Sequence, residues 1–266
     1  MRPRRRSVAR SCPQLQRSRD LTWDGCLNVR DLGGHRTEDG GETRFGAIVR
    51  ADSVRQLSGD GWAALMDYGV TTIVDLRGDH ERQEDPPHDV PVAVLHVPFM
   101  EANESEWKEI EDRIEAAVQT APDVPASTRE VYLIFLEHFK DNVAAGIRAV
   151  AHAPEGAVLI HCVGGKDRTG LLTAFLLHLA GVDTAQIADD YVLSEERLRS
   201  RHEEWFAAAE SDEELERLQR IAQTPAESMV GVFGELARRH GSVEGFLRDA
   251  GVTNEELRLA RARLRD

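Results

Sequence analysis

The middle of the chain alternates between short apolar runs and longer amphipathic stretches. Runs at 45–50, 70–76, 92–98 and 157–160 are short, and several are bounded by glycine or proline, which is typical of strands. From 127 to 151, apolar residues recur with a period near 3.6, and this predicts one long helix packed on the sheet. Strands that alternate with helices in this way favour a mostly parallel sheet with covered faces.

Beyond residue 170 the pattern becomes almost entirely helical. Helical patterns cover 171–177, 226–239 and 253–264. Between them, Thr184 and Ser194 are expected to begin two charged helices. The expected fold class is therefore α/β, with a mostly parallel central sheet flanked by helices and a helical C-terminal part.

The chain length suits one larger domain. With 266 residues, of which 41% are hydrophobic, it can bury a substantial core, and 21–266 is expected to form a single domain. A polar amphipathic helix is predicted at 101–119, and a proline-containing break follows it. Because polar helices beside such a break can hinge, 101–125 is a candidate helical lid.

Charge divides the chain unevenly. The first 20 residues contain seven arginines and one aspartate, whereas the whole chain has a formal net charge of −14. We expect 1–20 to be a disordered tail, with contact to an acidic partner as the alternative. This start lacks the apolar core of a secretory signal, and no stretch of eighteen apolar residues predicts a membrane span. The acidic body argues against nucleic-acid binding.

Cysteine and histidine usage bounds the compartment and the cofactors. Cys12, Cys26 and Cys162 are an odd, sparse set, which argues against a disulfide framework and favours a reducing, cytoplasmic location. Secretion without a conventional signal stays open. The histidines show no metal-ligand spacing, so we expect no metal and no cofactor.

The segment His161-Cys-Val-Gly-Gly-Lys-Asp-Arg-Thr-Gly170 concentrates the candidate chemistry. It follows an apolar strand and opens a helical pattern, so Cys162 is expected at a strand end, on a loop leading into a helix N-terminus. Backbone N–H groups and nearby cations at such a place favour the thiolate. Arg168 offers a planar fork that matches two phosphate oxygens. Nucleophile, anion cradle and clamp together indicate phosphoryl transfer through a phosphocysteine.

The loop resembles the H-C-x5-R-[ST]-G signature of cysteine-dependent protein tyrosine phosphatases. Its narrower form H-C-x-x-G-K-D-R-T-G, with the segments 28–34, 74–77 and 190–194, is similar to an atypical bacterial and fungal subgroup. That resemblance implies a phosphatase acting on phosphotyrosine, often also on phosphoserine, phosphothreonine or phosphoinositides. The expected phosphate ligands are the loop residues Val163, Gly164, Gly165, Lys166, Asp167 and Arg168. Thr169 is expected to donate its hydroxyl to the thiolate.

The proton donor is less constrained by the sequence. Many relatives place an aspartate on a W-P-D loop, which this chain lacks. The subgroup resemblance implies Asp167, beside the clamp. Asp75 at a strand end and Asp123 in Ala-Pro-Asp are the alternatives, because spacing alone does not give geometry. For Asp75, a structural ion pair with Arg77 is the favoured interpretation.

Several other residues have expected supporting roles. His161 either orients the loop or is a satisfied core histidine. Arg30 and Asp31 are expected to brace the loop 162–168, called the catalytic loop below, rather than to contact substrate. Lys166, at the lip of the pocket, suggests a second anionic group on the substrate, with a solvated turn residue as the alternative.

The function expected from these observations is a cysteine-based protein phosphatase that acts on a phosphorylated protein. A phosphoinositide phosphatase is the alternative, supported mainly by Lys166. A phosphate-binding module without turnover would not require the complete Cys162, Arg168 and Thr169 set. A sulfur-transfer or redox protein does not normally need an arginine six residues after its cysteine.

Overall fold

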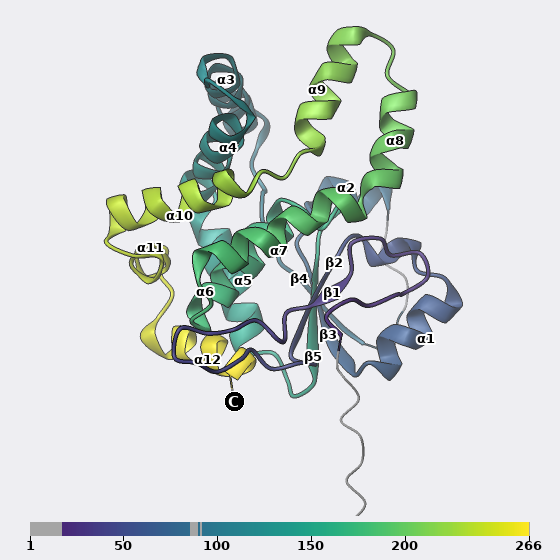
Figure 1. Ribbon diagram of the computed structural model, residues 1–266, viewed down its shortest axis with the longest axis vertical. Helices are drawn as coiled ribbons and strands as arrows, with labels where there is room; N and C mark the ends of the chain where they lie inside the picture. Colours follow the sequence, from purple (N-terminus) through teal and green to yellow (C-terminus); the bar gives the residue numbers. More distant parts are fainter. Residues whose placement is uncertain (1–17, 86–89, 91, 266) are drawn as a thin grey trace, which may run out of the picture.

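The computed structural model describes residues 18–85, 90 and 92–265. A five-stranded sheet stands at its centre, with strand order β1-β2-β5-β3-β4 (Figure 1). β1 pairs antiparallel with β2, and the other neighbours pair in parallel. The strands are β1 Arg30–Asp31, β2 Ile48–Ala51, β3 Val70–Asp75, β4 Ala93–His96 and β5 Ala157–His161. The predicted α/β class with a mostly parallel sheet is confirmed.

Helices cover both faces of the sheet and form the C-terminal part. Those up to the catalytic loop are α1 Gly59–Asp67, α2 Asp79–Glu84, α3 Glu104–Thr120, α4 Val124–His138 and α5 Lys140–Ala151, with a 3-10 turn at Val54–Gln56. Those after it are α6 Arg168–Leu179, α7 Thr184–Arg197, α8 Arg199–Ala207, α9 Asp212–Ala222, α10 Ala226–His240, α11 Val243–Asp249 and α12 Asn254–Arg265. None of the helices in the described ranges is both long and apolar enough to cross a bilayer.

Alternate residues of the strands feed two apolar layers. Ile48, Val158 and Ile160 pack into the larger layer with α5 and α6, whereas Val49 and Leu159 pack with α1 on the other face. Strand side chains alternate between faces, so the fully buried central strands β2 and β5 carry apolar residues on both sides, with Arg50 and His161 as buried polar exceptions. β1 and β4 are the edge strands, and β4 is largely exposed.

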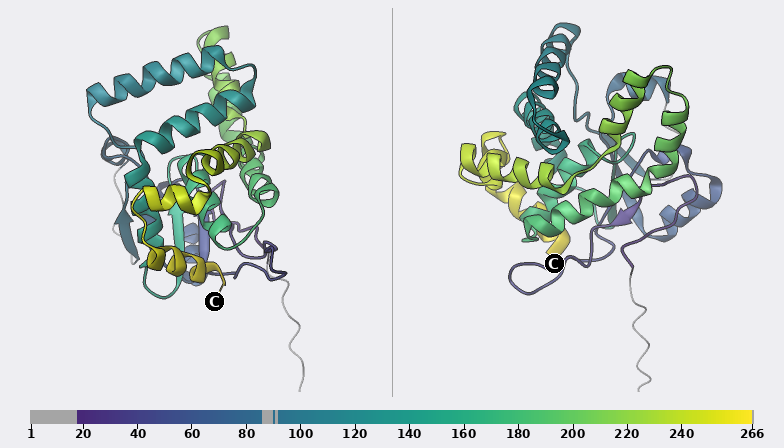
Figure 2. Two further views of the ribbon diagram at one scale, coloured as in Figure 1. Left: turned by 90° about the vertical axis from the view of Figure 1, so that its left-hand side faces the viewer. Right: turned by 45° about the horizontal axis from the view of Figure 1, so that its top comes forward.

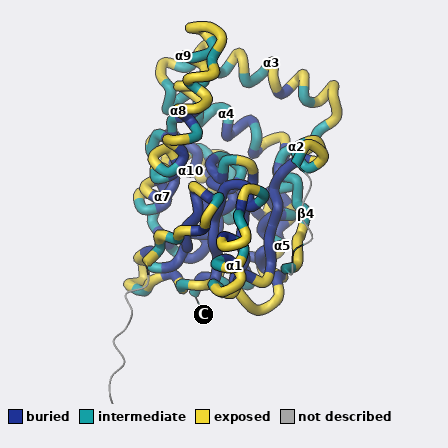
Figure 3. The backbone as a smooth tube through the Cα atoms, turned by 90° about the vertical axis from the view of Figure 1, so that its right-hand side faces the viewer, coloured by how far each residue is buried: buried dark blue, intermediate teal, exposed yellow. Residues whose placement is uncertain are grey.

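Two helical pairs stand beyond the sheet. α3 lies side by side with α4, and α8 with α9 forms a second projection (Figures 1 and 2). Exposed residues dominate α3, α8 and α9, whereas buried residues concentrate around the strands (Figure 3). The segment 101–125 thus contains α3 and the start of α4; its action as a lid stays a prediction.

The single long helix predicted over 127–151 is wrong. The chain breaks at Phe139, whose backbone leaves the helical region between α4 and α5. The Phe139 ring is buried with Ile110 and Ile134 and lies 5.6 Å from the ring of Trp107. Phe139 is apolar because it packs against α3, not because it lies on the face of one long helix. The apolar period therefore runs through the break without marking it.

The helix start predicted at Ser194 is also wrong. Thr184 does begin α7, with Asp183 as its N-cap, but α7 runs on through Ser194 to Arg197. Ser194 is fully buried, and its hydroxyl accepts a hydrogen bond from Arg30 instead of capping a helix. A serine that serves a buried guanidinium gives the same local signal as a cap.

The predicted boundary between tail and domain needs a correction. Residues 1–17 of the expected tail lie outside the described part of the chain. Arg19 and Asp20 belong to the fold. The backbone of Asp20 forms an antiparallel β-bridge with Arg30 of β1, and the Arg19 side chain forms an ion pair with Asp190. The domain therefore includes both residues.

Candidate active site

Cys162 lies at the carboxyl end of the central strand. β5 ends at His161, between β2 and β3, and α6 begins at Arg168. The Cys162 side chain is almost fully buried, with the residue 3% exposed. Ligands of parallel sheets bind at this edge, where helix N-termini favour anions. The structure places the predicted nucleophile where a strand, a loop and a helix N-terminus meet.

The loop turns sharply at Gly165. This residue has φ = +65°, and a Cβ there would lie 2.3 Å from the carbonyl oxygen of Ala51. Only glycine allows this backbone conformation and this approach to β2 without strain. Gly164 is less constrained, because a Cβ there would meet its nearest atom, of Leu198, at 3.8 Å.

Arg168 is the first residue of α6 and is paired before any substrate binds. Its Nη2 donates to Oε1 of Glu81 at 2.7 Å, and its Nη1 donates to Oε2 of the same carboxylate. Burial disfavours the charge, but attraction to Cys162 and to Glu81 holds the pKa of Arg168 above its usual value. Glu81 on α2 was not predicted from the sequence. It orients the guanidinium at the mouth of the loop.

Asp167, the predicted general acid, has a partly solvent-exposed side chain. Its side chain is 43% exposed. Oδ1 accepts a hydrogen bond from the Tyr132 hydroxyl at 2.5 Å, and that hydroxyl lies 2.7 Å from the hydroxyl of Tyr191. Burial and the negative charge of Asp167 raise the pKa of Tyr132 well above its usual value, so the phenol keeps its proton. Neither tyrosine was predicted from the sequence.

The alternative acids are both occupied by structural contacts. Asp75 is buried and holds Arg77 through two hydrogen bonds of 2.9 and 3.0 Å. Burial opposes its charge, but Arg77 holds the pKa of Asp75 below its usual value. Asp123 caps α4, because Oδ1 accepts the backbone N–H of Ala126 at 2.8 Å. Only Asp167, of the three, lies within the loop that joins Cys162 to Arg168.

His161 and Thr169 flank the loop from inside the fold. His161 Nδ1 lies 3.0 Å from the carbonyl oxygen of Cys162, and burial lowers the pKa of His161. A neutral imidazole that donates to this carbonyl orients the start of the loop. The Thr169 hydroxyl is buried and has no hydrogen-bond partner within the described ranges. Its predicted donation to the thiolate stays a prediction.

Lys166 does not project freely from the lip of the pocket. Only 8% of the residue is exposed, and its ammonium group donates to the carbonyl oxygen of Ile221 at the end of α9. The Asp167 carboxylate lies 3.5 Å from the same nitrogen. The sequence-based picture of a free cation awaiting a second anionic group is therefore wrong for this conformation.

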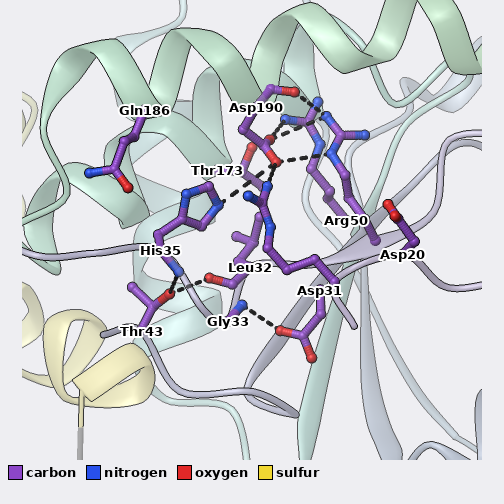
Figure 4. A network of polar contacts seen from close by, with 12 residues as sticks. Asp20, Asp31, Leu32, Gly33, His35, Thr43, Arg50, Thr173, Gln186 and Asp190 are labelled. Atoms are coloured by element: carbon purple, nitrogen blue, oxygen red, sulfur yellow. Dashed lines mark hydrogen bonds and ion pairs between the residues drawn. The ribbon is translucent and has the colours of Figure 1, made fainter. Parts of the chain in front are cut away.

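Arg30 and Asp31 lie at the base of the site, in β1. Arg30 is buried and binds Asp190 through Nε, at 3.0 Å from Oδ1. Asp31 accepts the backbone N–H groups of Gly33 (Figure 4) and Gly46, which pin the turn before β2. Neither side chain forms a hydrogen bond with the loop 162–168. Neither residue therefore braces the loop directly. Arg30 can act on the loop only through its partners Asp190 and Asn28.

The described residues contain no group of three or more histidine, cysteine or carboxylate side chains placed to hold a metal ion. The residues around Cys162 instead present one thiol, one oriented guanidinium and one accessible carboxyl. Such a set suits a thiol-based displacement on an anionic phosphate ester, with proton transfer to the leaving group.

Comparison with known proteins agrees with this chemistry. A protein from Nostoc commune named tyrosine-protein phosphatase is 27% identical over 233 residues, covering 82% of this chain and 74% of the relative. The triple specificity protein phosphatase PtpB of Mycobacterium tuberculosis is 28% identical over 262 residues, covering 86% of this chain and 93% of the relative. The family model of the tyrosine phosphatases matches residues 21–266. The chain therefore belongs to the tyrosine phosphatase family.

Proposed function

We propose that Cys162, Arg168 and Asp167 carry the phosphatase reaction of this chain. The family makes it a phosphoric monoester hydrolase of the protein tyrosine phosphatase type. The observation that supports the residue assignment most is the position of Cys162, at the end of a buried central strand and before the α6 N-terminus. The attraction to Cys162 that raises the pKa of Arg168 supports a role for this guanidinium next to the nucleophile.

The first step forms a bond between the Cys162 sulfur and phosphorus. The bond from phosphorus to the tyrosine oxygen breaks, and the Asp167 carboxyl gives its proton to that oxygen. Loop N–H groups and the Arg168 guanidinium hold the equatorial oxygens, whose charge must be stabilised in the transition state. In the second step Asp167 accepts a proton from water, the water oxygen attacks phosphorus, and the sulfur leaves as thiolate.

The contact between Glu81 and Arg168 suits the binding of phosphate by the Arg168 guanidinium. A guanidinium has five N–H donors, so contacts through Nη1 and Nη2 to Glu81 leave Nε and further hydrogens for phosphate. Burial opposes the charge of Glu81, but Arg168 holds the pKa of Glu81 below its usual value, so the carboxylate is ionised and keeps the fork oriented.

Phosphotyrosine on a protein is the substrate that we infer, with phosphoserine and phosphothreonine as further substrates. The name of the Mycobacterium tuberculosis relative, a triple specificity phosphatase, supports a relaxed preference. Phosphoinositides are the alternative, but their support in the sequence weakens because the Lys166 ammonium is bound to Ile221. A thiolate nucleophile suits a reducing compartment, so we infer a cytoplasmic location.

Replacing the nucleophile tests the assignment. Cys162→Ser should lower phosphate release from a phosphotyrosine peptide by several powers of ten, because the activated nucleophile is lost. Cys26→Ser is the matched control, since Cys26 is also a buried free thiol, but it donates a hydrogen bond to the Asp52 carboxylate. Turnover above about one per cent in Cys162→Ser would contradict the assignment.

Substrate preference needs one further measurement. Phosphotyrosine, phosphoserine and phosphothreonine peptides are compared with inositol phospholipids in a single phosphate-release assay with the unmodified enzyme. A higher kcat/KM for the peptides is expected. A higher value for the lipids would make the alternative the main activity.

A further inference from the structure

Three consecutive carbonyl groups of the catalytic loop are held from outside the loop. The carbonyl oxygen of Val163 accepts the backbone N–H of Ser53 at 2.9 Å. That of Gly164 accepts Nδ2 of Asn28 at 3.0 Å, and that of Gly165 accepts Nη2 of Arg50 at 2.7 Å. All three donors belong to the segments around β1 and β2.

Holding a carbonyl also sets the direction of the next N–H group. A trans peptide is planar, and its C=O and N–H point in opposite directions. The peptide that carries the Gly164 carbonyl also carries the N–H of Gly165, and the Gly165 carbonyl shares a peptide with the N–H of Lys166. Bonds that draw these carbonyls toward β1 and β2 therefore turn the N–H groups to the opposite side, where an anion is to be bound.

Two of the three donors are tied to one buried carboxylate. Arg50 Nη1 donates to Asp190 Oδ2 at 2.7 Å, and both side chains are 1% exposed (Figure 4). Arg30 binds Asp190 through Nε at 3.0 Å and binds the Asn28 side-chain oxygen through Nη1 at 2.6 Å. Asp190 on α7 thus fixes Arg50 directly and fixes Asn28 through Arg30.

The cluster also leaves positive charge beneath the nucleophile. Three guanidinium groups, those of Arg19, Arg30 and Arg50, face the single carboxylate of Asp190. Burial opposes the charge of Asp190, but these arginines hold its pKa far below the usual range, so it is ionised. Burial and repulsion from Arg30 lower the pKa of Arg50 to about 10, which still leaves it charged near neutral pH. Attraction to Cys162 acts in the opposite direction.

We propose that Arg50 and Asn28, held by Asp190, are positioning residues that direct the N–H groups of Gly165 and Lys166 toward the bound phosphate. This inference rests on the proposed role of Cys162 and the loop. It assigns a function to residues far from the signature that do not contact the substrate.

Two readouts on the full chain test the positioning. Cys162 is alkylated with iodoacetamide and the modified peptide is quantified by mass spectrometry, so that protection by inorganic phosphate gives the phosphate Kd. The second readout is kcat for a phosphotyrosine peptide, because the same N–H groups stabilise the transition state. Cys26 is followed as a separate peptide; burial and Asp52 raise the pKa of Cys26 far above its usual value, so its reaction is slow.

The three variants should weaken phosphate binding and slow the reaction together. Arg50→Gln should weaken the phosphate Kd by about tenfold and lower kcat, because the Gly165 carbonyl loses the guanidinium. Arg50→Lys keeps the charge, but a point charge cannot bridge both partners, so the Kd should still weaken. Asn28→Ala should also weaken the Kd, because the Gly164 carbonyl loses its donor.

Arg265→Gln is the matched control. Arg265 also bridges a main-chain carbonyl, that of Ala180 at 2.9 Å, and a carboxylate, that of Asp39 at 2.6 Å, but at the opposite end of α6 from the loop. Neither readout should change in this variant. A change as large as that of Arg50→Gln would mean that general destabilisation, not positioning, is being measured.

Two results would overturn the inference. An Arg50→Gln protein that folds by circular dichroism, with kcat and phosphate Kd unchanged, contradicts the positioning role. If this variant does not fold, unchanged phosphate protection in Arg50→Lys and Asn28→Ala contradicts the positioning role. Failure of the proposed function is recognised separately. In that case the enzyme with the wild-type sequence would still release phosphate after Cys162 has been alkylated.

Discussion

The hydroxyl of Tyr132 lies 2.5 Å from Oδ1 of Asp167, although the two residues come from α4 and the catalytic loop. Because the tyrosine keeps its proton, it donates this hydrogen bond to the carboxyl group. A general acid must lie within reach of the leaving oxygen before it can act. Tyr132 therefore restricts the Asp167 carboxyl group to one position in the first step and in the second.

Tyr132→Phe tests this relationship. Loss of the hydrogen bond frees the Asp167 carboxyl group to rotate, so kcat for a phosphotyrosine peptide should fall by about tenfold while KM changes little. Tyr191→Phe is the control, because the Tyr191 hydroxyl contacts Tyr132 and forms no hydrogen bond with Asp167. An unchanged kcat in Tyr132→Phe, or the same loss in both variants, would contradict the direct effect.

Asp167→Asn should show which carboxyl donates the proton. Its kcat should fall far more for aryl phosphates with poor leaving groups than for those with good ones, because good leaving groups depart without a proton. Asp75→Asn and Asp123→Asn should not steepen this dependence. The readout is kcat against leaving-group pKa; a steep slope in Asp75→Asn would transfer the role to Asp75.

Arg168→Lys should be nearly as damaging as Arg168→Ala. The guanidinium holds Glu81 with Nη1 and Nη2 and must also hold phosphate, and an ammonium group cannot reproduce both bidentate contacts. We expect both variants to lose on the order of a hundredfold or more in kcat. Steady-state kinetics on a phosphotyrosine peptide give the answer, and recovery of most of kcat by lysine would exclude the fork as the reason.

Gly165→Ala should disrupt both fold and activity. The positive φ costs about 1–3 kcal/mol for a residue with a side chain, and the Cβ would meet the Ala51 carbonyl at 2.3 Å. Gly164→Ala is the matched variant for stability, since its Cβ meets its nearest atom only at 3.8 Å. Chemical denaturation should show a clear loss for the first and a small change for the second; equal losses would contradict the backbone argument.

Stability should fall between pH 6.5 and pH 4. Burial, and then repulsion from Arg19, lower the pKa of His35 from 6.5 to about 4. In this window the unfolded chain binds a proton that the folded chain does not, so stability present above pH 6.5 is lost as the pH falls. The loss from this residue approaches about 3 kcal/mol. It precedes the acid loss from carboxylates with lowered pKa, such as Asp190, which begins near pH 4.

His35→Asn should flatten this pH dependence. Urea denaturation at pH 5 and pH 7 measures it, and part of the slope should remain because burial also lowers the pKa of His161 and of His202. His80→Asn is the control, since the His80 side chain is exposed on α2. A slope unchanged in His35→Asn would assign the effect to the other histidines.

The features that the sequence predicted well are local ones. The strand, loop and helix around Cys162 follow from an apolar run, two glycines and a helical period within about twenty residues. Thr184 and the edge of the α3 helix were likewise close to the observed boundaries. Composition and alternation sufficed for the α/β class because each element carries its own period.

The contacts that the sequence did not predict are long-range. Glu81 is 87 residues from Arg168, and Arg50 is 115 residues from Gly165. Both look like ordinary surface charges in the sequence, since a polar residue beside an apolar run usually faces solvent. One signal was available for Arg50: it ends an apolar strand that the pattern predicts to be covered, where an arginine needs a buried partner.

The dependence of the loop on Asp190 has a consequence for the order of synthesis. A chain made only as far as Val182 already contains Cys162, Arg168 and both inner arginines, but it lacks the carboxylate that holds those arginines in place. Without α7, burying Arg30 and Arg50 side by side would cost free energy that nothing offsets. The loop carbonyls of Gly164 and Gly165 therefore gain their partners in full only after α7 has been made and has docked.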